Sequence, residues 1–161
     1  MKVLFVTLVL FLLSFNAVQA APLDHGPAVN GQKVLKIIFD VNVGEPAKLL
    51  LRLRLIEQTF SELQEAGIAP AFVVAFRGKA SRFITRGDQY VSAEDLPYKE
   101  SVLNYLQRFK EKGFSLEQCA IAANLLRIDT KDFVSLVKVV PNGYISLAGY
   151  QSQGYSFIPM D

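Results

Sequence analysis

The chain has 161 residues, a length that suits one ordinary domain and leaves little room for a second. Its net charge of +2 lacks the basic excess typical of nucleic-acid-binding proteins, so we expect no nucleic-acid partner, and its hydrophobic content of 51% excludes wholesale disorder. A single cysteine excludes an internal disulfide, and one cysteine with one histidine excludes a zinc site built from these two residue types.

The start of the chain has the pattern of an export signal. Lys2 is followed by an apolar run at 3–13, and Val18 and Ala20 stand where a signal peptidase would recognise its cleavage site. This pattern predicts a secretory signal peptide (1–20) cut after Ala20. The protein is then expected to be periplasmic or secreted, with no stable membrane insertion after cleavage. The alternative is an uncleaved N-terminal anchor, although the apolar run is short for a membrane span.

A short leader precedes the folded domain. Residues 21–33 contain prolines, glycines, Asp and Asn, which predict a flexible segment, and His25 within it is expected only to be solvated. We therefore expect the folded domain over 34–161.

The first half of this domain predicts two parallel strands joined by a helix. Residues 34–41 are β-branched and mostly apolar, which is typical of a central strand buried on both faces. Residues 46–67 predict an amphipathic helix that Gly67 ends, and residues 69–76 predict the second strand. This spacing indicates a right-handed crossover. The buried stripe of the helix is expected to comprise Leu49, Leu53, Ile56, Phe60 and Leu63.

The second half continues the alternation of helices and strands. A polar, irregular stretch is expected at 80–98, with Pro97 as a breaker, and then a helix at 101–112 that Gly113 ends. The remaining expected elements are a strand at 114–119, a helix at 120–126, a helical turn after 129–132, a strand at 136–140, a short helix within 144–153 and a strand at 155–158. The pattern predicts a single compact α/β domain, with a mostly parallel sheet of about five strands and helices on both faces.

Cys119 is the main candidate for chemistry. It ends a predicted strand, and ligands of parallel sheets bind outside the carboxyl ends of the strands. The helix expected at 120–126 would present N–H groups and partial positive charge to the sulfur, which favours the nucleophilic thiolate. Strand alternation places Cys119 with Ser115 and Glu117 on the more polar face. The alternative is an inert core cysteine, because unpaired cysteine is among the most buried residue types.

A basic loop follows the second strand and is the candidate anion site. Since Gly78 allows a close backbone approach, Arg77, Gly78 and Lys79 are predicted to hold a small anion, with Arg82 and Arg86 further along the loop. The alternative is a solvated basic surface. The sequence contains neither a phosphate-loop nor a dinucleotide-binding motif, and we expect no metal and no cofactor.

Three acidic or amide residues near the same strand ends have expected local roles. Glu117 is a neighbour of the thiol, and its negative charge would oppose a thiolate at Cys119. Asp40 and Asn42, at the end of the first strand, are expected to cap the following helix or to line a cleft.

Three segments of the last third, taken in order, carry a resemblance to a known family. They are GFSLEQC at 113–119, VKVVPNG at 137–143 and QSQGYSFI at 151–158. Together they resemble the DsrE/DsrF-like (sulfur-relay, YchN-like fold) family, in its exported branch. The resemblance implies a compact α/β fold, a homo-oligomer that is commonly a trimer or hexamer, and a cysteine that carries persulfide sulfur, to which Cys119 corresponds. The relay members are cytoplasmic and act with dedicated partner proteins, whereas this chain carries a predicted export signal.

These observations favour an exported sulfur carrier, sulfurtransferase-like if it turns over, which holds sulfane sulfur as a persulfide on Cys119. Its partners would be a small sulfur anion or an acceptor thiol. The alternative is a non-catalytic oligomeric module that binds a small ligand or a protein and has a structural cysteine. Surplus apolar residues on the first helix favour an oligomer in either case: Leu50, Leu51 and Leu55. A redox protein with a Cys119–Cys119 disulfide between chains is the least favoured hypothesis.

Overall fold

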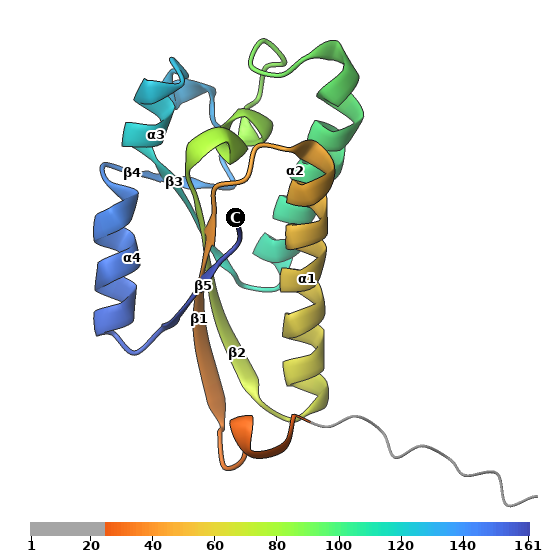
Figure 1. Ribbon diagram of the computed structural model, residues 1–161, viewed down its shortest axis with the longest axis vertical. Helices are drawn as coiled ribbons and strands as arrows, with labels where there is room; N and C mark the ends of the chain where they lie inside the picture. Colours follow the sequence, from red (N-terminus) through yellow and green to blue (C-terminus); the bar gives the residue numbers. More distant parts are fainter. Residues whose placement is uncertain (1–24) are drawn as a thin grey trace, which may run out of the picture. The chain divides into compact units, whose positions relative to one another are not determined.

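The computed structural model describes residues 25–161 (Figure 1). The predicted signal peptide (1–20) and its cleavage site lie outside the described residues, as does the first part of the predicted leader (21–33). In the described part of the leader, Gly26–Ala28 forms a short 3-10 helix, η1. No helix within residues 25–161 is long and apolar enough to cross a lipid bilayer.

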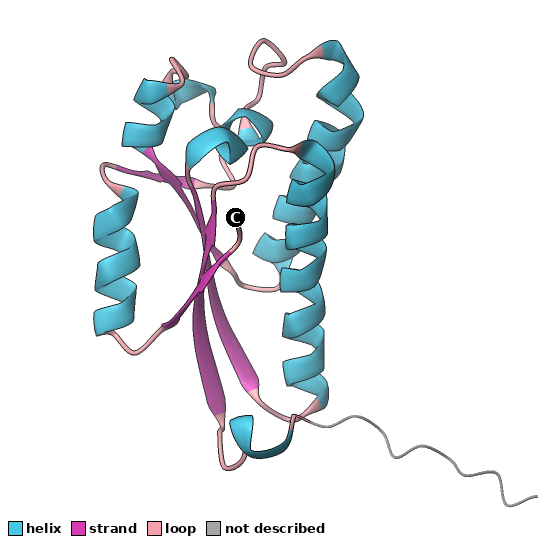
Figure 2. Cartoon of the chain, in the orientation of Figure 1, coloured by secondary structure: helices cyan, strands magenta, loops and turns pink. Residues whose placement is uncertain are grey.

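A sheet of five strands, parallel throughout, forms the middle of the domain (Figure 2). In spatial order β4-β3-β2-β1-β5, the strands are Lys138–Val140, Ser115–Cys119, Ala69–Phe76, Val34–Val41 and Ser156–Pro159. The last five residues of both β1 and β2 are buried, as expected for strands that are covered on both faces. The predicted α/β fold is confirmed, and the sheet is wholly rather than mostly parallel.

Helices cover both faces of this sheet (Figures 1 and 2). α1 (Pro46–Glu65) and α2 (Leu96–Glu111) pack against each other on one face, whereas α4 (Gly143–Ser152) packs on the other. The short helix α3 (Ala120–Leu125) follows β3 directly. The predicted stripe of α1 is buried in full: Leu49, Leu53, Ile56, Phe60 and Leu63.

Phenylalanine rings fill the core between the sheet and helices α1 and α2. Phe114 immediately precedes β3, and its ring centroid lies 4.9 Å from that of Phe60, 5.2 Å from that of Phe72 and 4.7 Å from that of Phe109. On the opposite face, Leu147 of α4 belongs to a smaller cluster with residues of β1 and β2. Both faces of the central strands are therefore packed.

Two stretches differ from the sequence prediction. α2 begins at Leu96 rather than at 101, and Pro97 lies in its first turn, where the missing N–H has no intrahelical partner to lose. The 3-10 helix η2 (Gly78–Ile84) extends into the stretch predicted to be polar and irregular, and Ala80 and Phe83 are among its buried residues. The other α-helices and the strands lie within two residues of their predicted bounds, whereas the helical turn expected after 129–132 is the 3-10 helix η4 (Thr130–Asp132) inside that stretch.

The cap of α1 also differs from the expectation. Neither Asp40 nor Asn42 caps this helix; Glu45 does. Its two carboxylate oxygens accept the N–H groups of Ala47 at 3.0 Å and Lys48 at 2.6 Å. Asp40 is thus free to pair with another strand end, as described below.

Candidate functional site

The carboxyl ends of the parallel strands meet at one edge of the sheet, and the candidate site lies there. Asn42 follows β1, Arg77 follows β2 and Cys119 ends β3. The three strands are neighbours in the order β3-β2-β1, so residues far apart in sequence come together. This is the edge at which ligands of open parallel sheets bind.

A cavity of about 540 Å³ opens at this edge. It brings together all four residues predicted for sulfur and anion chemistry, namely Arg77, Gly78, Lys79 and Cys119, with Asn42 beside them. The rest of its wall is apolar or aromatic and comes from α3, the residue after it and α4: Ile121, Ala122, Leu125, Leu126 and Tyr144. The cavity volume falls in the range of roughly 300–1,000 Å³ that small-molecule sites occupy.

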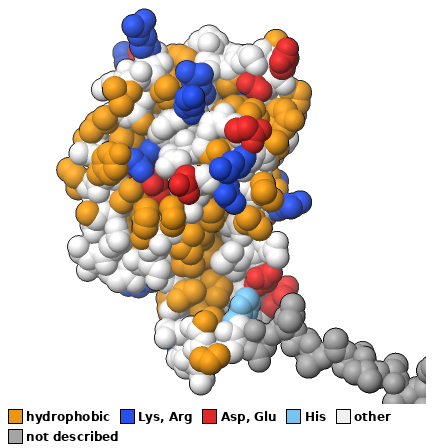
Figure 3. All heavy atoms as spheres, in the orientation of Figure 1, with side chains coloured by type: hydrophobic (Ala, Val, Ile, Leu, Met, Phe, Trp, Pro, Cys, Tyr) orange, Lys and Arg blue, Asp and Glu red, His pale blue; other side chains and the backbone are white. Residues whose placement is uncertain are grey.

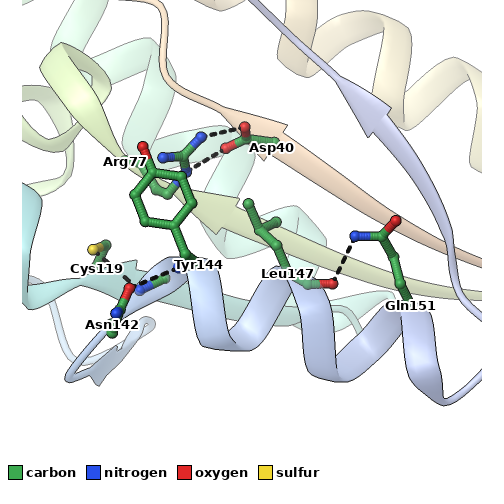
Figure 4. Close-up of polar contacts among 8 residues, drawn as sticks. Asp40, Arg77, Cys119, Asn142, Tyr144, Leu147 and Gln151 are labelled. Atoms are coloured by element: carbon green, nitrogen blue, oxygen red, sulfur yellow. Dashed lines mark hydrogen bonds and ion pairs between the residues drawn. The ribbon is translucent and has the colours of Figure 1, made fainter.

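Cys119 is buried but lines this cavity. Its residue exposure is only 3%, and its Sγ accepts a hydrogen bond from the backbone N–H of Gly143 at 3.2 Å (Figure 4). Gly143 is the first residue of α4, whose cap is Asn142; the Asn142 side chain accepts the N–H of Tyr144 at 2.9 Å. The sulfur therefore contacts the N-terminal end of α4, where backbone N–H groups carry partial positive charge.

The sequence analysis predicted that the N–H groups facing the Cys119 sulfur would come from α3, and this prediction is wrong. Cys119 does precede α3, but its side chain makes no capping hydrogen bond there. The N–H group that contacts the sulfur comes from a residue 24 positions later in the chain. The face predicted to be the more polar one is likewise covered, because α4 packs over both Cys119 and Glu117.

Arg77 is held in a charge pair rather than left free. Its Nε donates to Asp40 Oδ1 at 2.7 Å and its Nη2 to Asp40 Oδ2 at 2.5 Å, with side-chain exposures of 14% for Arg77 and 5% for Asp40. These hydrogen bonds raise the pKa of Arg77 above its ordinary value. The guanidinium also lies over the ring of Tyr144, 4.3 Å from its centroid (Figure 4). The charge of Arg77 is therefore balanced by Asp40.

Lys79 remains as the uncompensated cation of the cavity. It is exposed, and no carboxylate within residues 25–161 forms an ion pair with it. Gly78, with φ of +51°, brings the basic loop close to β1, because a Cβ at this position would lie 2.9 Å from the carbonyl oxygen of Asn42. Arg82 and Arg86 do not line the cavity.

A family model for the DsrE/DsrF-like family matches residues 33–160, which is most of the chain. The chain belongs to the DsrE/DsrF-like family. It is therefore related to sulfur-relay proteins.

Two solved structures have the fold of this DsrE/DsrF-like chain. One is a protein of unknown function, MTH1491, from Methanobacterium thermoautotrophicum, with a TM-score of 0.60 and 15% identity; the other is the ychN protein from E. coli, with a TM-score of 0.55 and 16% identity. Each comparison covers 78% of this chain and 98% of the other. At such identities the likeness concerns the fold alone.

An uncharacterized protein of Aquifex aeolicus (strain VF5) is 29% identical over 126 residues, or 78% of this chain. The chain spans 56% of the length of that curated relative.

Glu117 belongs to a different cavity of the DsrE/DsrF-like domain. It shares a strand face with Cys119, but it lines a separate space of about 240 Å³ with Lys110, Lys138 and Tyr150. Glu117 Oε1 accepts the hydroxyl of Tyr150 at 3.1 Å. Burial, and then the negative charge of Glu117, raises the pKa of Tyr150 to about 12, which keeps the phenol protonated for this hydrogen bond. The two predicted neighbours thus face separate surroundings.

The apolar wall is the part of the site that sequence analysis missed. Leu125 and Ile121 are exposed, whereas Ala122 and Ala123 between them are buried. The six-residue helix is too short to show its period before its buried side is known. Within residues 25–161, no group of three His, Cys, Asp or Glu side chains is arranged to hold a metal ion.

Substitution of Gly143 with alanine tests the close contact beneath the sulfur. A Cβ at this position would lie 2.9 Å from Cys119 Cβ and 2.9 Å from Arg77 Cδ, well inside ordinary carbon–carbon contact. We expect Gly143→Ala to lower the free energy of unfolding by about 1–3 kcal/mol in urea titration, because α4 must shift. The control is Gly149→Ala in the same helix, where a Cβ meets nothing within 4 Å. It should gain up to about 1 kcal/mol from helix propensity. Equal stability of Gly143→Ala and the wild type would contradict the contact.

Proposed function

We propose that this protein is a sulfurtransferase-like sulfur carrier that holds sulfane sulfur as a persulfide on Cys119. The observation that carries the proposal is the placement of its only cysteine at a cavity on the carboxyl edge of the sheet, with a backbone N–H directed at the sulfur. Lys79 on the cavity wall would attract an anionic donor.

The proposed step needs no cofactor and balances by itself. The Cys119 thiolate attacks a sulfane sulfur of the donor, a new S–S bond forms, and the donor's own S–S bond breaks. The shortened donor leaves with the bonding electron pair and takes up a proton from water. An acceptor thiolate then attacks the outer sulfur of the Cys119 persulfide and restores the thiolate. The N–H of Gly143 would stabilise negative charge on the cysteine sulfur in both steps.

Mass spectrometry of the intact protein tests this proposal. The reduced protein is freed of reductant, incubated with inorganic polysulfide and analysed without further reducing agent. We expect a gain of one sulfur atom, located on Cys119 by peptide mapping and removed by dithiothreitol. Cys119→Ser should gain no sulfur. A wild-type protein that gains no sulfur from polysulfide, nor from an organic persulfide used in its place, would refute the proposal.

A structural cysteine is the second candidate, and the 3% exposure of Cys119 favours it. Alkylation in the native state separates the two functions. A sulfur carrier should be labelled by iodoacetamide through the cavity on the time scale of a free thiol, whereas a structural cysteine should be labelled only after unfolding. The same burial makes a disulfide between two Cys119 residues the weakest candidate, and nonreducing electrophoresis would reveal such a covalent dimer.

We also propose that the protein is exported, cut after Ala20, and assembled as a trimer or hexamer. The sequence of the first twenty residues and the family resemblance support these points. The N-terminal sequence of protein recovered from the periplasm or medium should begin at Ala21. Sedimentation of the purified protein should give the mass of three or six chains, and a monomer would refute the assembly.

A further inference from the structure

We propose that the sulfur donor or acceptor at this site is an amphipathic organic thiol or persulfide, with an apolar body and one anionic group, rather than a bare inorganic sulfur anion. This inference rests on the proposed function of Cys119 and names the class of substrate that the cavity would select. The argument comes from the wall of the cavity, its charge and its size.

The apolar part of the wall is exposed to solvent. Leu125 is 80% exposed and Ile121 and Tyr144 are also exposed, although all three line the same cavity as the sulfur. Covering large apolar side chains removes them from water, which is favourable in proportion to the area covered. An inorganic polyatomic anion has no apolar surface with which to cover them, whereas an alkyl or aryl body has.

The charged part of the wall suits a single negative charge. Arg77 is paired with Asp40, so the net charge of these two residues is zero, and Lys79 supplies the remaining positive charge. A carboxylate donor in the protonated form R–S–SH, which is the form that reacts, carries one negative charge and would be matched by one lysine. A dianion such as thiosulfate would keep one charge without a partner beside an apolar wall, which is unfavourable.

The size of the cavity points the same way. Its volume of about 540 Å³ lies within the range that organic ligands fill. A bare sulfur anion of a few atoms would leave most of this space, and the surface of α3 along it, in contact with water. Figure 4 shows Tyr144 standing beside Arg77 and near Cys119, so the aromatic wall is close to the reacting sulfur.

The proposed transfer moves the outer sulfur atom of a persulfide donor to Cys119. The Cys119 thiolate attacks the outer sulfur of the persulfide R–S–SH and forms a new S–S bond with it. The S–S bond of the persulfide breaks, and R–S⁻ leaves with the electron pair and is protonated by water. Cys119 then carries the –S–SH group. The apolar body of R would lie along α3 while its carboxylate faces Lys79. No oxidant or reductant is consumed.

Rates of sulfur gain from a donor series test the inference. The donors are inorganic polysulfide and the persulfides of 3-mercaptopropionic and 8-mercaptooctanoic acid, and the readout is the intact mass of the protein over time. We expect the eight-carbon donor to load Cys119 at least about tenfold faster than the three-carbon donor, because each buried methylene adds to recognition. Leu125→Ser should abolish this chain-length preference. The control Ile145→Ser, at a 70% exposed apolar residue of α4 outside the cavity wall, should keep it.

A binding arm separates failure of the inference from failure of the proposed function. Octanoate is titrated calorimetrically into Cys119→Ser protein, where no sulfur chemistry can occur, and again after adding Leu125→Ser or Lys79→Ala. Binding that either added substitution weakens about tenfold supports recognition of an amphipathic anion by the cavity. If no donor loads Cys119, this recognition still stands, but the sulfur-carrier proposal is refuted and the ligand is then not a sulfur donor. Equal loading by all donors, or no octanoate binding, would overturn the inference. The carrier role would still stand in that case, provided that Cys119 gains sulfur.

Discussion

Replacing Asp40 with alanine should lower the free energy of unfolding by about 3–5 kcal/mol, because it leaves the guanidinium of Arg77 without its partner in a largely buried position. The pair joins the end of β1 to the end of β2 at the edge that carries the cavity. Urea denaturation monitored by circular dichroism measures the loss. We also expect the cavity at this edge to widen, because the Arg77 guanidinium lies over the ring of Tyr144 and would no longer be held by Asp40.

Two further variants show whether the loss comes from the unpaired charge. Asp40→Ala combined with Arg77→Met should recover most of the stability, because a buried ion pair replaced by apolar side chains is often neutral. The matched control is Glu57→Ala, which removes a two-bond pair with Arg108 and a longer ion pair with Lys112, at a more exposed place between α1 and α2. That change should cost no more than about 1 kcal/mol. An Asp40→Ala variant as stable as Glu57→Ala would contradict the buried pair.

Phe114→Ala should be as damaging as the loss of Asp40, at about 3–5 kcal/mol, for a different reason. Phe114 is buried and packs against three rings, those of Phe60, Phe72 and Phe109. Truncation leaves a cavity at the point where β2, α2 and the start of β3 meet. Urea denaturation again measures the change. The control is Phe157→Ala on β5, an exposed phenylalanine, for which we expect less than about 1 kcal/mol. Equal effects at both positions would contradict this description of the core.

The sequence predicts the elements whose signals are local. β1 and β2 have the bounds predicted for them because an uninterrupted run of β-branched and apolar residues is typical of a strand buried on both faces. The α1 stripe is also correct, since twenty residues show the helical period clearly. The predicted start of α2, at 101, is wrong because the prediction treats Pro97 as a helix breaker, whereas Pro97 lies in the first turn of the helix, where its missing N–H costs no hydrogen bond.

The contacts of the site depend on tertiary structure, so they were harder to predict. That Arg77, Gly78, Lys79 and Cys119 line one cavity follows from the rule for parallel strand ends. The pairing of Asp40 with Arg77 depends on the register of β1 against β2, which no local pattern reveals. The N–H group on the sulfur comes from Gly143, and only the packing of α4 onto β3 brings it there.

Helices α3 and α4 contribute different features to the cavity. The N–H group that donates to the Cys119 sulfur comes from α4, whereas most of the apolar side chains that line the cavity come from α3. Substitutions along α3 should therefore change which ligands the cavity prefers and leave the hydrogen bond to the Cys119 sulfur unchanged. If the proposed carrier role holds, a library of variants confined to Ile121 and Leu125 would change the preference for the ligand and leave the surroundings of the Cys119 sulfur unaltered.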